Sequence, residues 1–398
     1  MAPQDLWLKS DGERSARYGV GKRWRVNYNR PDGTPGTKAF ARKTDAIVFE
    51  NNIKADLSRG QFIDPAAGKM TVREFGETWA RNKKAAVDPA TALLIERGLR
   101  LHIYPILGGE PLFKLVNSDI QSWVTDRAQV LQPVTLRATY HLVLQPLLSA
   151  AVIDKKIGSS PCVAIKLPKR LKRPYHIPPA SKVHALSKAL PERYRAAPWL
   201  AAGCGLRPAE VLGLEDGAVA FLNEEVDVVQ QVKYIPRRGQ YLALPKTKLV
   251  RTVDLPAVVA EAVTEQLRVA PPIEYELDDE TDQKAIRIDR STGERRVPRR
   301  KTQLLFSTST GKPLYTSDFS KMWIDAVAAA ELPKGFRFHD LRHFFATSLI
   351  HNGASVETVR LTLGHATLKT TFETYVHEWP DLKEQPRSIM DRVLARAR

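Results

Sequence analysis

Six polar residues in the second half of the chain constrain its fold more than any other feature. They lie far apart in the sequence and would have to meet in one place: Arg207, Lys246, His339, Arg342, His365 and Tyr375. A phenol can carry a phosphoryl group, guanidiniums and imidazoles can bind its non-bridging oxygens, and an ammonium can protonate a leaving alkoxide. The ordered set therefore predicts a site that breaks and rejoins a phosphodiester.

The segments around these residues favour helices that would present them. Arg207 follows Gly205 and precedes Pro208, and proline suits the first position of a helix. We therefore expect its guanidinium at a helix start, where free backbone N–H groups also attract an anion. His339 and Arg342 are three residues apart, a spacing that places both on one face of a helix.

Together these residues resemble the signature of the tyrosine recombinases, the phage-type integrase family. That signature is an arginine in a G-L-R-x-x-E context, a lysine on a β-turn, H-x-x-R, a histidine in L-G-H and a C-terminal tyrosine. Each part occurs here in that order. The resemblance implies that Tyr375 attacks the scissile phosphate. It also implies that four residues bind this phosphate: Arg207, Arg342, His339 and His365.

By the same resemblance a lysine is the general acid, and two lysines are candidates. Lys246 precedes a strand-like segment, 251–255, and is favoured. Lys248 is two residues away and would point to the same side of a strand, so it remains an alternative. Next to these groups, we expect Glu210 to be a structural partner of Arg207. We expect His343 to support a neighbouring site residue or to pack, rather than to take part in the chemistry.

The resemblance implies a site-specific DNA recombinase. Such an integrase cleaves and rejoins DNA strands through a covalent 3′-phosphotyrosine intermediate and so integrates or excises a phage or another mobile element. The implied partners are double-stranded attachment sites and a homotetramer on synapsed DNA, with a host DNA-bending protein and an excisionase as open questions. Fixed cations can stabilise the charge on the equatorial oxygens, so no metal and no cofactor is expected.

Three alternatives compete with this interpretation. A DNA-binding regulator could carry the same residues in an inactive geometry, and a type IB topoisomerase shares the chemistry. His339 and His343 also have the i, i+4 spacing of a zinc-protease helix. In that helix Asp340 would replace the usual glutamate and Arg342 would place a cation beside the metal, which makes a zinc metalloprotease remote.

The charge balance agrees with a nucleic-acid substrate. The 398-residue chain has 61 Lys and Arg against 44 Asp and Glu, a formal net charge of +17 and an isoelectric point of about 9.8, which favours a polyanionic partner.

Its two cysteines, Cys162 and Cys204, have no metal-ligand spacing. The longest uncharged stretch, 138–153, is too short to span a bilayer, and the N-terminus lacks the apolar region of a signal peptide. We expect a soluble cytoplasmic protein.

We expect an α+β, multidomain fold whose first part is residues 1–65. Hydrophobic and polar residues alternate over 22–28, a turn is expected at 31–33 and a returning strand at 38–41. A helix is expected from about Thr44 to a stop at Gly60. This three-stranded sheet plus helix resembles the arm-type DNA-binding domain of many integrases. Its candidate DNA contacts are Arg23, Arg25 and Lys38.

Residues 70–158 have helical patterns with recognisable starts. The predicted starts are the capping box 71–74, Asp88-Pro89, the cap Asn117-Ser118 and Pro133. Four such helices are similar to the core-binding domain that integrases clamp on DNA. The proline-rich basic segment 159–179 follows, and we expect it to be an interdomain linker along the phosphate backbone. Its candidate DNA contacts are Lys166, Lys169, Arg170, Lys172 and Arg173.

The remaining residues, 180–398, are expected to form the catalytic domain, a mixed and mainly helical fold with a small antiparallel sheet. The stretch 219–255 would supply a β-hairpin that carries Lys246. Residues 271–301 are polar and charged, and we expect an insertion with too little apolar surface to form core. The tail around 388–394 could form a short helix that docks on a neighbouring protomer or on its own subunit.

Overall fold

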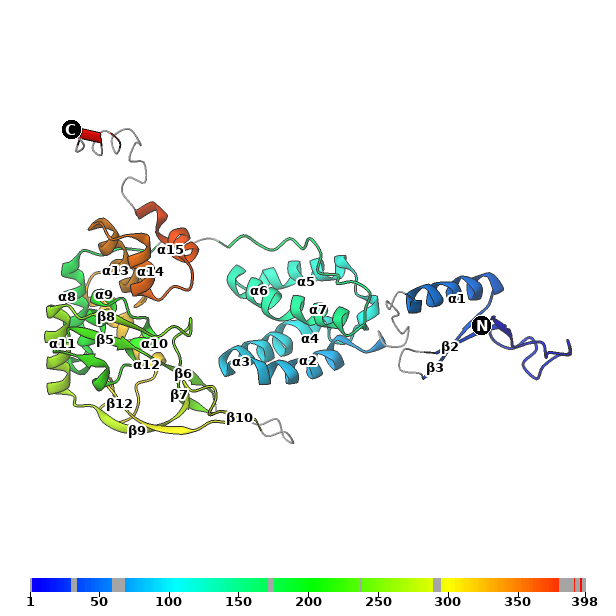
Figure 1. Ribbon diagram of the computed structural model, residues 1–398, viewed down its shortest axis with the longest axis horizontal. Helices are drawn as coiled ribbons and strands as arrows, with labels where there is room; N and C mark the ends of the chain where they lie inside the picture. Colours follow the sequence, from blue (N-terminus) through cyan, green and yellow to red (C-terminus); the bar gives the residue numbers. More distant parts are fainter. Residues whose placement is uncertain are drawn as a thin grey trace. The chain divides into compact units, whose positions relative to one another are not determined.

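The protein is a multidomain α+β chain that divides into two compact units, Met1–Leu171 and Lys172–Arg398. Its structure is a computed structural model (Figure 1). The described residues are 2–29, 34–58, 69–170, 175–236, 238–288, 295–378, 390 and 394–395. The first unit contains a small sheet with a helix and then a set of helices. The second unit contains helices and several small sheets.

A three-stranded antiparallel sheet with the order β1-β2-β3 begins the chain. Its strands and the helix after them are β1 (Gln4–Asp5), β2 (Trp24–Asn29), β3 (Pro35–Phe40) and α1 (Lys43–Ser58). The predicted alternation is seen in the second part of β2, where Val26 and Tyr28 are buried and Asn27 is exposed; Trp24 and Arg25 are both half-buried. Tyr28 packs with Ile53 of α1. The turn expected at 31–33 and the helix stop expected at Gly60 lie outside the described residues.

The next described residues, 69–158, form helices, two of which run through a short π-helical segment. They are α2 (Val72–Ala86), α3 (Pro89–Arg97) continuing through η2 (Gly98–Ile103) into α4 (Tyr104–Leu107), α5 (Asn117–Val130), and α6 (Pro133–Thr139) continuing through η4 (Tyr140–Leu144) into α7 (Gln145–Ile153). Their buried faces share one core that includes Ile103, Trp123 and Leu147. Amphipathic faces of this kind pack because apolar area is removed from water.

The helix starts agree with the sequence except at α5. The Glu74 carboxylate accepts the Thr71 backbone N–H at 2.8 Å, and the Thr71 hydroxyl accepts the Glu74 N–H, which completes the predicted capping box. The expected cap of α5 by Asn117 is wrong. Asp119 instead accepts the backbone N–H of Val116 at 2.9 Å, because Asn117 is engaged elsewhere.

The segment expected to be a linker is held on the helices over its first half. The Asn117 amide donates to the carbonyls of Pro161 and Val163 at 3.1 and 2.6 Å. The Gln121 side chain accepts the Lys166 N–H at 2.9 Å and donates to the Lys166 carbonyl at 3.2 Å. Residues up to 170 thus belong to the first unit, and the next described residue, Tyr175, belongs to the second.

The helix Pro133–Ile153, formed by α6, η4 and α7, is the one described helix that is long and apolar enough to cross a membrane. The expectation that this stretch is too short was wrong, because the helix starts before the uncharged residues. Leu136, Leu144 and Leu147 are completely buried in the helical core. A core helix passes the same test of length and composition.

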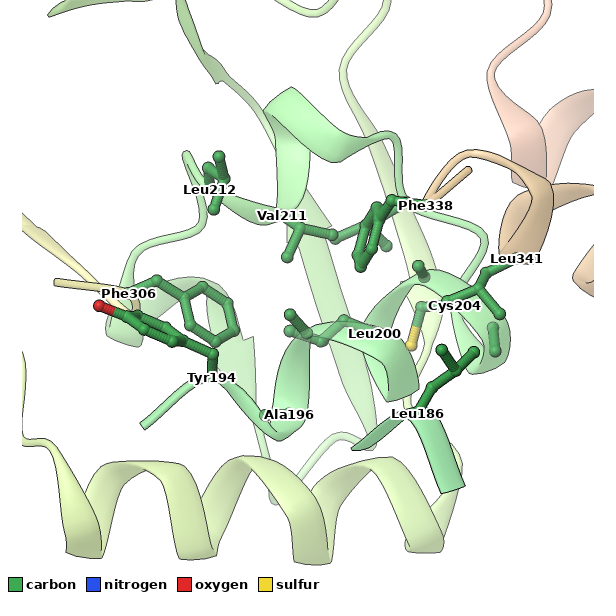
Figure 2. Close-up of a cluster of buried hydrophobic side chains, with 14 of the residues drawn as sticks. Leu186, Tyr194, Ala196, Leu200, Cys204, Val211, Leu212, Phe306, Phe338 and Leu341 are labelled. Carbon is green, nitrogen blue, oxygen red and sulfur yellow. The ribbon is translucent and has the colours of Figure 1, made fainter. Parts of the chain in front are cut away.

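The second unit is organised around one large hydrophobic core. Its helices are α8 (Ala180–Ala189), α9 (Ala196–Gly203), α10 (Pro208–Val211), α11 (Ala257–Val269), α12 (Thr316–Ala329), α13 (Asp340–His351), α14 (Val356–Leu363) and α15 (Leu368–Tyr375). Leu200 of α9, Val211 of α10 and Leu341 of α13 are fully buried together. Figure 2 shows them with Cys204 and Phe338. Because α10 and α13 pack in the same core, the start of α10 at Arg207 and the helix that carries Arg342 are held together.

The strands of the second unit form two main sheets rather than one. One is antiparallel, with the order β4-β5-β8; the other has the order β12-β9-β7-β6, with β7 parallel to β9. The strands are β4 (Val219–Ala220), β5 (Glu225–Val228), β6 (Gln231–Ile235), β7 (Gly239–Ala243), β8 (Arg251–Asp254), β9 (Ile273–Glu280) and β12 (Arg299–Leu304). Lys246 therefore does not lie on the expected hairpin. It lies on the connection from β7 to β8, between the two sheets.

The charged segment 271–301 contributes to a sheet and a small core, contrary to expectation. Strand β9 pairs antiparallel with β12, and Tyr275 and Leu277 are buried with Leu242 and Leu304. The sequence misleads here because the charges of the two strands neutralise one another across the ladder. Lys301 lies 2.8 Å from Glu274 and Arg299 lies 3.1 Å from Glu276, which leaves the alternate apolar side chains free to pack.

A two-stranded antiparallel ribbon extends from this sheet. Its strands are β10 (Arg287–Ile288) and β11 (Arg295–Arg296), and Figure 1 shows it projecting from the end of β9. The expected tail helix at 388–394 lies largely outside the described residues.

Candidate active site

Arg207 lies at the start of α10, as expected. The backbone N–H of Arg207 is accepted by Glu210 Oε2 at 2.9 Å, and its Nη1 donates to Glu210 Oε1 at 2.7 Å. The expectation that Glu210 is a structural partner of Arg207 is consistent with this geometry. Gly205, two residues earlier, has a φ of +67°, and a Cβ there would lie 2.5 Å from the Phe345 ring. Only glycine fits at position 205, because a side chain would collide with Phe345 and the positive φ disfavours other residues.

Arg342 is on α13 and is almost completely buried. Its guanidinium donates to the carbonyls of Gly205, at 2.6 Å, and Leu363. Burial and the charge of Arg207 lower the pKa of Arg342 to about 9, whereas Glu210 opposes the shift. Arg342 therefore remains a cation at neutral pH and ties the segment of Arg207 to the end of α14.

His339 precedes α13, one turn before Arg342 and His343. The rings of His339 and His343 lie 5.2 Å apart with nearly perpendicular planes. Burial, His343 and the charges of Arg342 and Arg207 lower the pKa of His339 to about 3. This imidazole is neutral at pH 7, so it can donate one hydrogen bond to a phosphate oxygen without adding charge.

His365 follows the left-handed Gly364, which ends α14 at a φ of +61°. Its Nδ1 lies 2.9 Å from the hydroxyl of Thr371, which is fully buried on α15. That contact fixes the ring orientation and leaves Nε2 for another partner. Burial and the neighbouring arginines, led by Arg342, lower the pKa of His365 to about 3.

Tyr375 is the last residue of α15 and is buried, with 1% of its surface exposed. Burial raises the pKa of its phenol, while the positive charges of Arg342 and Arg207 act in the opposite direction. Its hydroxyl lies 2.8 Å from Nδ1 of His343. The charges of Arg207 and Arg342 thus act on three other predicted site residues: Tyr375, His339 and His365.

Lys246 lies on the exposed loop between β7 and β8. The loop is anchored next to His365, because the Thr247 hydroxyl donates to the Gly364 carbonyl at 3.2 Å. The sequence placed Lys248 on the same side of a strand, and this is wrong. Lys248 has a φ of +57° and closes a tight turn by donating its N–H to the Pro245 carbonyl at 2.7 Å.

The sequence did not single out Arg251. Its side chain on β8 is 7% exposed. The guanidinium donates to both carboxylate oxygens of Glu210 at 3.3 and 2.8 Å and to the Thr362 carbonyl at 2.8 Å. Burial alone would raise the pKa of Glu210, but the hydrogen bonds and charge of Arg251, with Arg207 and Arg342, lower it to about 2. In the sequence, Arg251 stands out only as the first residue of the predicted strand 251–255, which does not indicate that it contacts Glu210.

The geometry gives the zinc-protease alternative no ligand set. Among the described residues, no group of three or more His, Cys, Asp or Glu side chains is placed to hold a metal ion. Asp340 occupies the position where the protease helix has glutamate. Its carboxylate accepts the Arg337 backbone N–H at 2.9 Å and pairs with the Arg337 guanidinium at 2.8 Å.

The predicted DNA contacts differ in how far they are already engaged within the first unit. Arg23 forms an ion pair with Asp5 at 2.8 Å, and Arg25 donates to Gln4 at 2.6 Å. Lys38 lies 4.5 Å over the Phe49 ring. The other described contacts have exposed side chains and no ion pair with a described residue: Lys166, Lys169 and Arg170. Lys172 and Arg173 lie outside the described residues.

The chain is similar in sequence to known integrases and tyrosine recombinases and similar in fold to solved integrase structures. The model of the phage integrase family matches residues 180–380. The chain is 25% identical over 348 residues to the integrase of Mycobacterium phage D29, covering 83% of each protein. It is 28% identical over 342 residues to the tyrosine recombinase XerC of Brucella melitensis, covering 79% of this chain and 92% of XerC.

The fold is similar to that of the Tn1549 transposon integrase, solved in complex with transposon right end DNA. The two structures superpose with a TM-score of 0.66 at 22% identity, over 82% of this chain and 100% of the other. The matched share of this chain is longer than either compact unit, so the similarity in fold includes parts of both.

Proposed function

Because this chain belongs to the phage integrase family, we propose that Tyr375 is the nucleophile with which it opens and reseals attachment-site DNA. The protein is a site-specific DNA recombinase of mobile elements, and it breaks and rejoins DNA strands as tyrosine recombinases do. The residues that perform the reaction are the proposal here. The observation that carries it is the burial of the Tyr375 hydroxyl beside α13, within the field of Arg342 and Arg207.

In the proposed reaction, Arg207 and Arg342 bind the non-bridging oxygens of the scissile phosphate. Each guanidinium keeps N–H groups that Glu210 and the backbone carbonyls do not occupy. His339 and His365 donate to the same oxygens as neutral imidazoles, so the positive charge of the site comes from the arginines. Such preorganised donors stabilise the charge that develops on the equatorial oxygens.

Lys246 is the proposed general acid. The hydrogen bond from Thr247 to Gly364 holds the Lys246 loop next to His365, which supports a position for the ammonium near a phosphate bound by His365. The Tyr375 oxygen forms a bond to phosphorus, the bond to the 5′ oxygen breaks, and the 5′ oxygen takes a proton from Lys246. Resealing reverses each step, and one phosphoester replaces another without an energy source.

We also propose roles for the remaining parts of the chain. The helical residues 69–158 and the exposed cations of 166–170 contact the core DNA site, and the sheet with α1 contacts a separate arm site. Exchange of two duplexes requires four strand cleavages. Since each protomer supplies one Tyr375, the working assembly is a homotetramer. In a bacterial cell the reaction takes place in the cytoplasm, where the DNA lies.

The decisive experiment is to trap the covalent complex on a nicked attachment-site substrate, digest it and identify the modified peptide. We expect the nucleotide on Tyr375. Tyr375→Phe removes only the hydroxyl and should abolish the complex while DNA affinity stays near wild type. Tyr241→Phe, a buried tyrosine of β7, serves as the matched control. DNA attached to a residue other than Tyr375 would refute the assignment.

A further inference from the structure

The hydroxyl of Tyr375 makes a close contact that the predicted site does not include. Nδ1 of His343 lies 2.8 Å from the Tyr375 oxygen. From the sequence, His343 was expected to support a neighbouring site residue or to pack, and not to take part in the chemistry. The structure places it in direct contact with the proposed nucleophile, at normal hydrogen-bond length.

The His343 ring is held in this orientation from two sides. The Tyr175 ring stacks on it with a centroid separation of 4.4 Å and an angle of 11° between the planes. The His339 ring meets its edge at 5.2 Å. Tyr175 is itself fixed, because its hydroxyl lies 3.0 Å from His377 Nε2 and donates to Glu378 at 3.1 Å. Such packing keeps Nδ1 aimed at the phenol rather than at solvent.

Burial favours the neutral form of His343, which can accept a proton. Burial lowers its pKa to about 4; Asp340 raises it, and Arg337 and Arg342 lower it. The other ionisable groups that face the ring are Tyr175, Tyr375 and the neutral His339. A neutral imidazole protonated at Nε2 has its lone pair on Nδ1, and this lone pair then accepts the Tyr375 hydroxyl.

The buried phenol needs such an acceptor. Burial raises the pKa of Tyr375 well above its usual range, so the free phenolate is scarce at neutral pH. The proton must then leave as the oxygen attacks phosphorus. Arg207 and Arg342 can stabilise the developing charge, but guanidinium has no lone pair to take a proton.

We propose that His343 is a catalytic residue, the general base that accepts the Tyr375 proton during strand cleavage. This inference rests on the proposed role of Tyr375. The new bond is Tyr375 Oη to phosphorus, and the bond from phosphorus to the 5′ oxygen breaks. The phenolic proton moves to His343 Nδ1, and the 5′ oxygen is protonated by Lys246. On resealing, His343 returns the proton to Tyr375.

The test separates deprotonation of the nucleophile from protonation of the leaving group. Single-turnover formation of the covalent complex is measured on a normal nicked substrate and on one with sulfur at the bridging 5′ position. A thiolate leaves without protonation. Lys246→Ala should therefore regain its rate on the sulfur substrate. His343→Asn should lose about a hundredfold on both substrates, the scale of general base catalysis.

His343→Asn retains a hydrogen-bond acceptor near the place of Nδ1 but cannot take a proton, so it separates proton transfer from positioning. His184→Asn is the matched control, since it makes the same change at an exposed histidine of α8, and it should react as wild type. Free imidazole should restore cleavage to His343→Ala. Should that variant not fold, His343→Asn decides alone.

Wild-type rates for His343→Asn on both substrates would overturn the inference. So would recovery of His343→Asn on the sulfur substrate, which would place His343 on the leaving-group side. These outcomes differ from failure of the proposed function, which appears in the wild-type protein as DNA attached to a residue other than Tyr375.

Discussion

Glu210 Oε2 lies 2.8 Å from Nη2 of Arg251, and both side chains are buried. The same carboxylate pairs with Arg207 at 2.7 Å and lies 4.0 Å from Arg342. One negative charge thus holds three cations close together, which their mutual repulsion would otherwise oppose. The arrangement leaves an excess of positive charge for a phosphate.

Glu210→Gln keeps the shape but removes the charge, and it should cost about 3 kcal/mol or more in unfolding free energy because buried arginines lose their partner. The folded pKa of Glu210 lies below its unfolded value, so its contribution is full above the unfolded pKa. It is lost as the pH falls toward about 2. Denaturant unfolding from pH 7 to pH 2 should show the two proteins converging. A constant difference across that range would contradict this account.

Arg207→Ala should lower single-turnover cleavage on the order of a hundredfold or more, since a donor to the transition state is lost. Arg207→Lys should recover little, because one ammonium cannot replace a two-pronged guanidinium. Arg268→Ala is a suitable control, since its exposed side chain pairs with Glu265 on the same helix. Cleavage by Arg207→Ala at the rate of that control would remove Arg207 from the site.

Arg342→Ala should lose both activity and stability. Its buried guanidinium joins the carbonyls of Gly205 and Leu363, and truncation leaves both acceptors unpaired. We expect a lower thermal midpoint as well as cleavage reduced on the order of a hundredfold. Paired measurements of melting and cleavage check this. An unchanged melting temperature would show that the two carbonyl contacts contribute nothing to stability.

Lys246 and Lys248 can be separated by their backbone conformations. Lys248→Gly suits the positive φ at that position and removes the ammonium without straining the turn. We expect it to cleave within a few fold of wild type, whereas Lys246→Ala should lose about a hundredfold on an oxygen leaving group. A larger loss for Lys248→Gly would assign the general acid to Lys248.

The exposed cations between 166 and 170 should contribute to the salt dependence of DNA binding. Each phosphate contact adds about 0.9 to the slope of log affinity against log salt, so Lys166→Ala, Lys169→Ala and Arg170→Ala combined should reduce the slope by about 2 to 3. Lys321→Ala, an exposed lysine of the second unit, is the control. A slope equal to that of the control would show that the segment does not touch DNA.

The sequence predicted local structure correctly where a side chain interacts with residues close to it in the chain. The capping box at Thr71 and the alternation in β2 need only nearby residues, and both are seen in the structure. Prediction failed where a partner comes from far along the chain. Asn117 is a residue type that commonly caps helices, but its side chain donates to the Pro161 carbonyl. The charged strand β9 pairs with β12. No local window contains both members of such a pair.

The order of its polar motifs by itself indicated the family of this protein and the chemistry of phosphodiester exchange, because a phenol, guanidiniums, imidazoles and an ammonium can together bind a phosphate and exchange its ester bond. Tertiary packing decided which neighbours surround the proposed nucleophile. Arg251 reaches Glu210 from another strand, and the Tyr375 hydroxyl reaches His343 from another helix. Contacts between segments so distant in sequence depend on the shared core of the second unit, since only its packing brings these helices and strands within hydrogen-bonding distance.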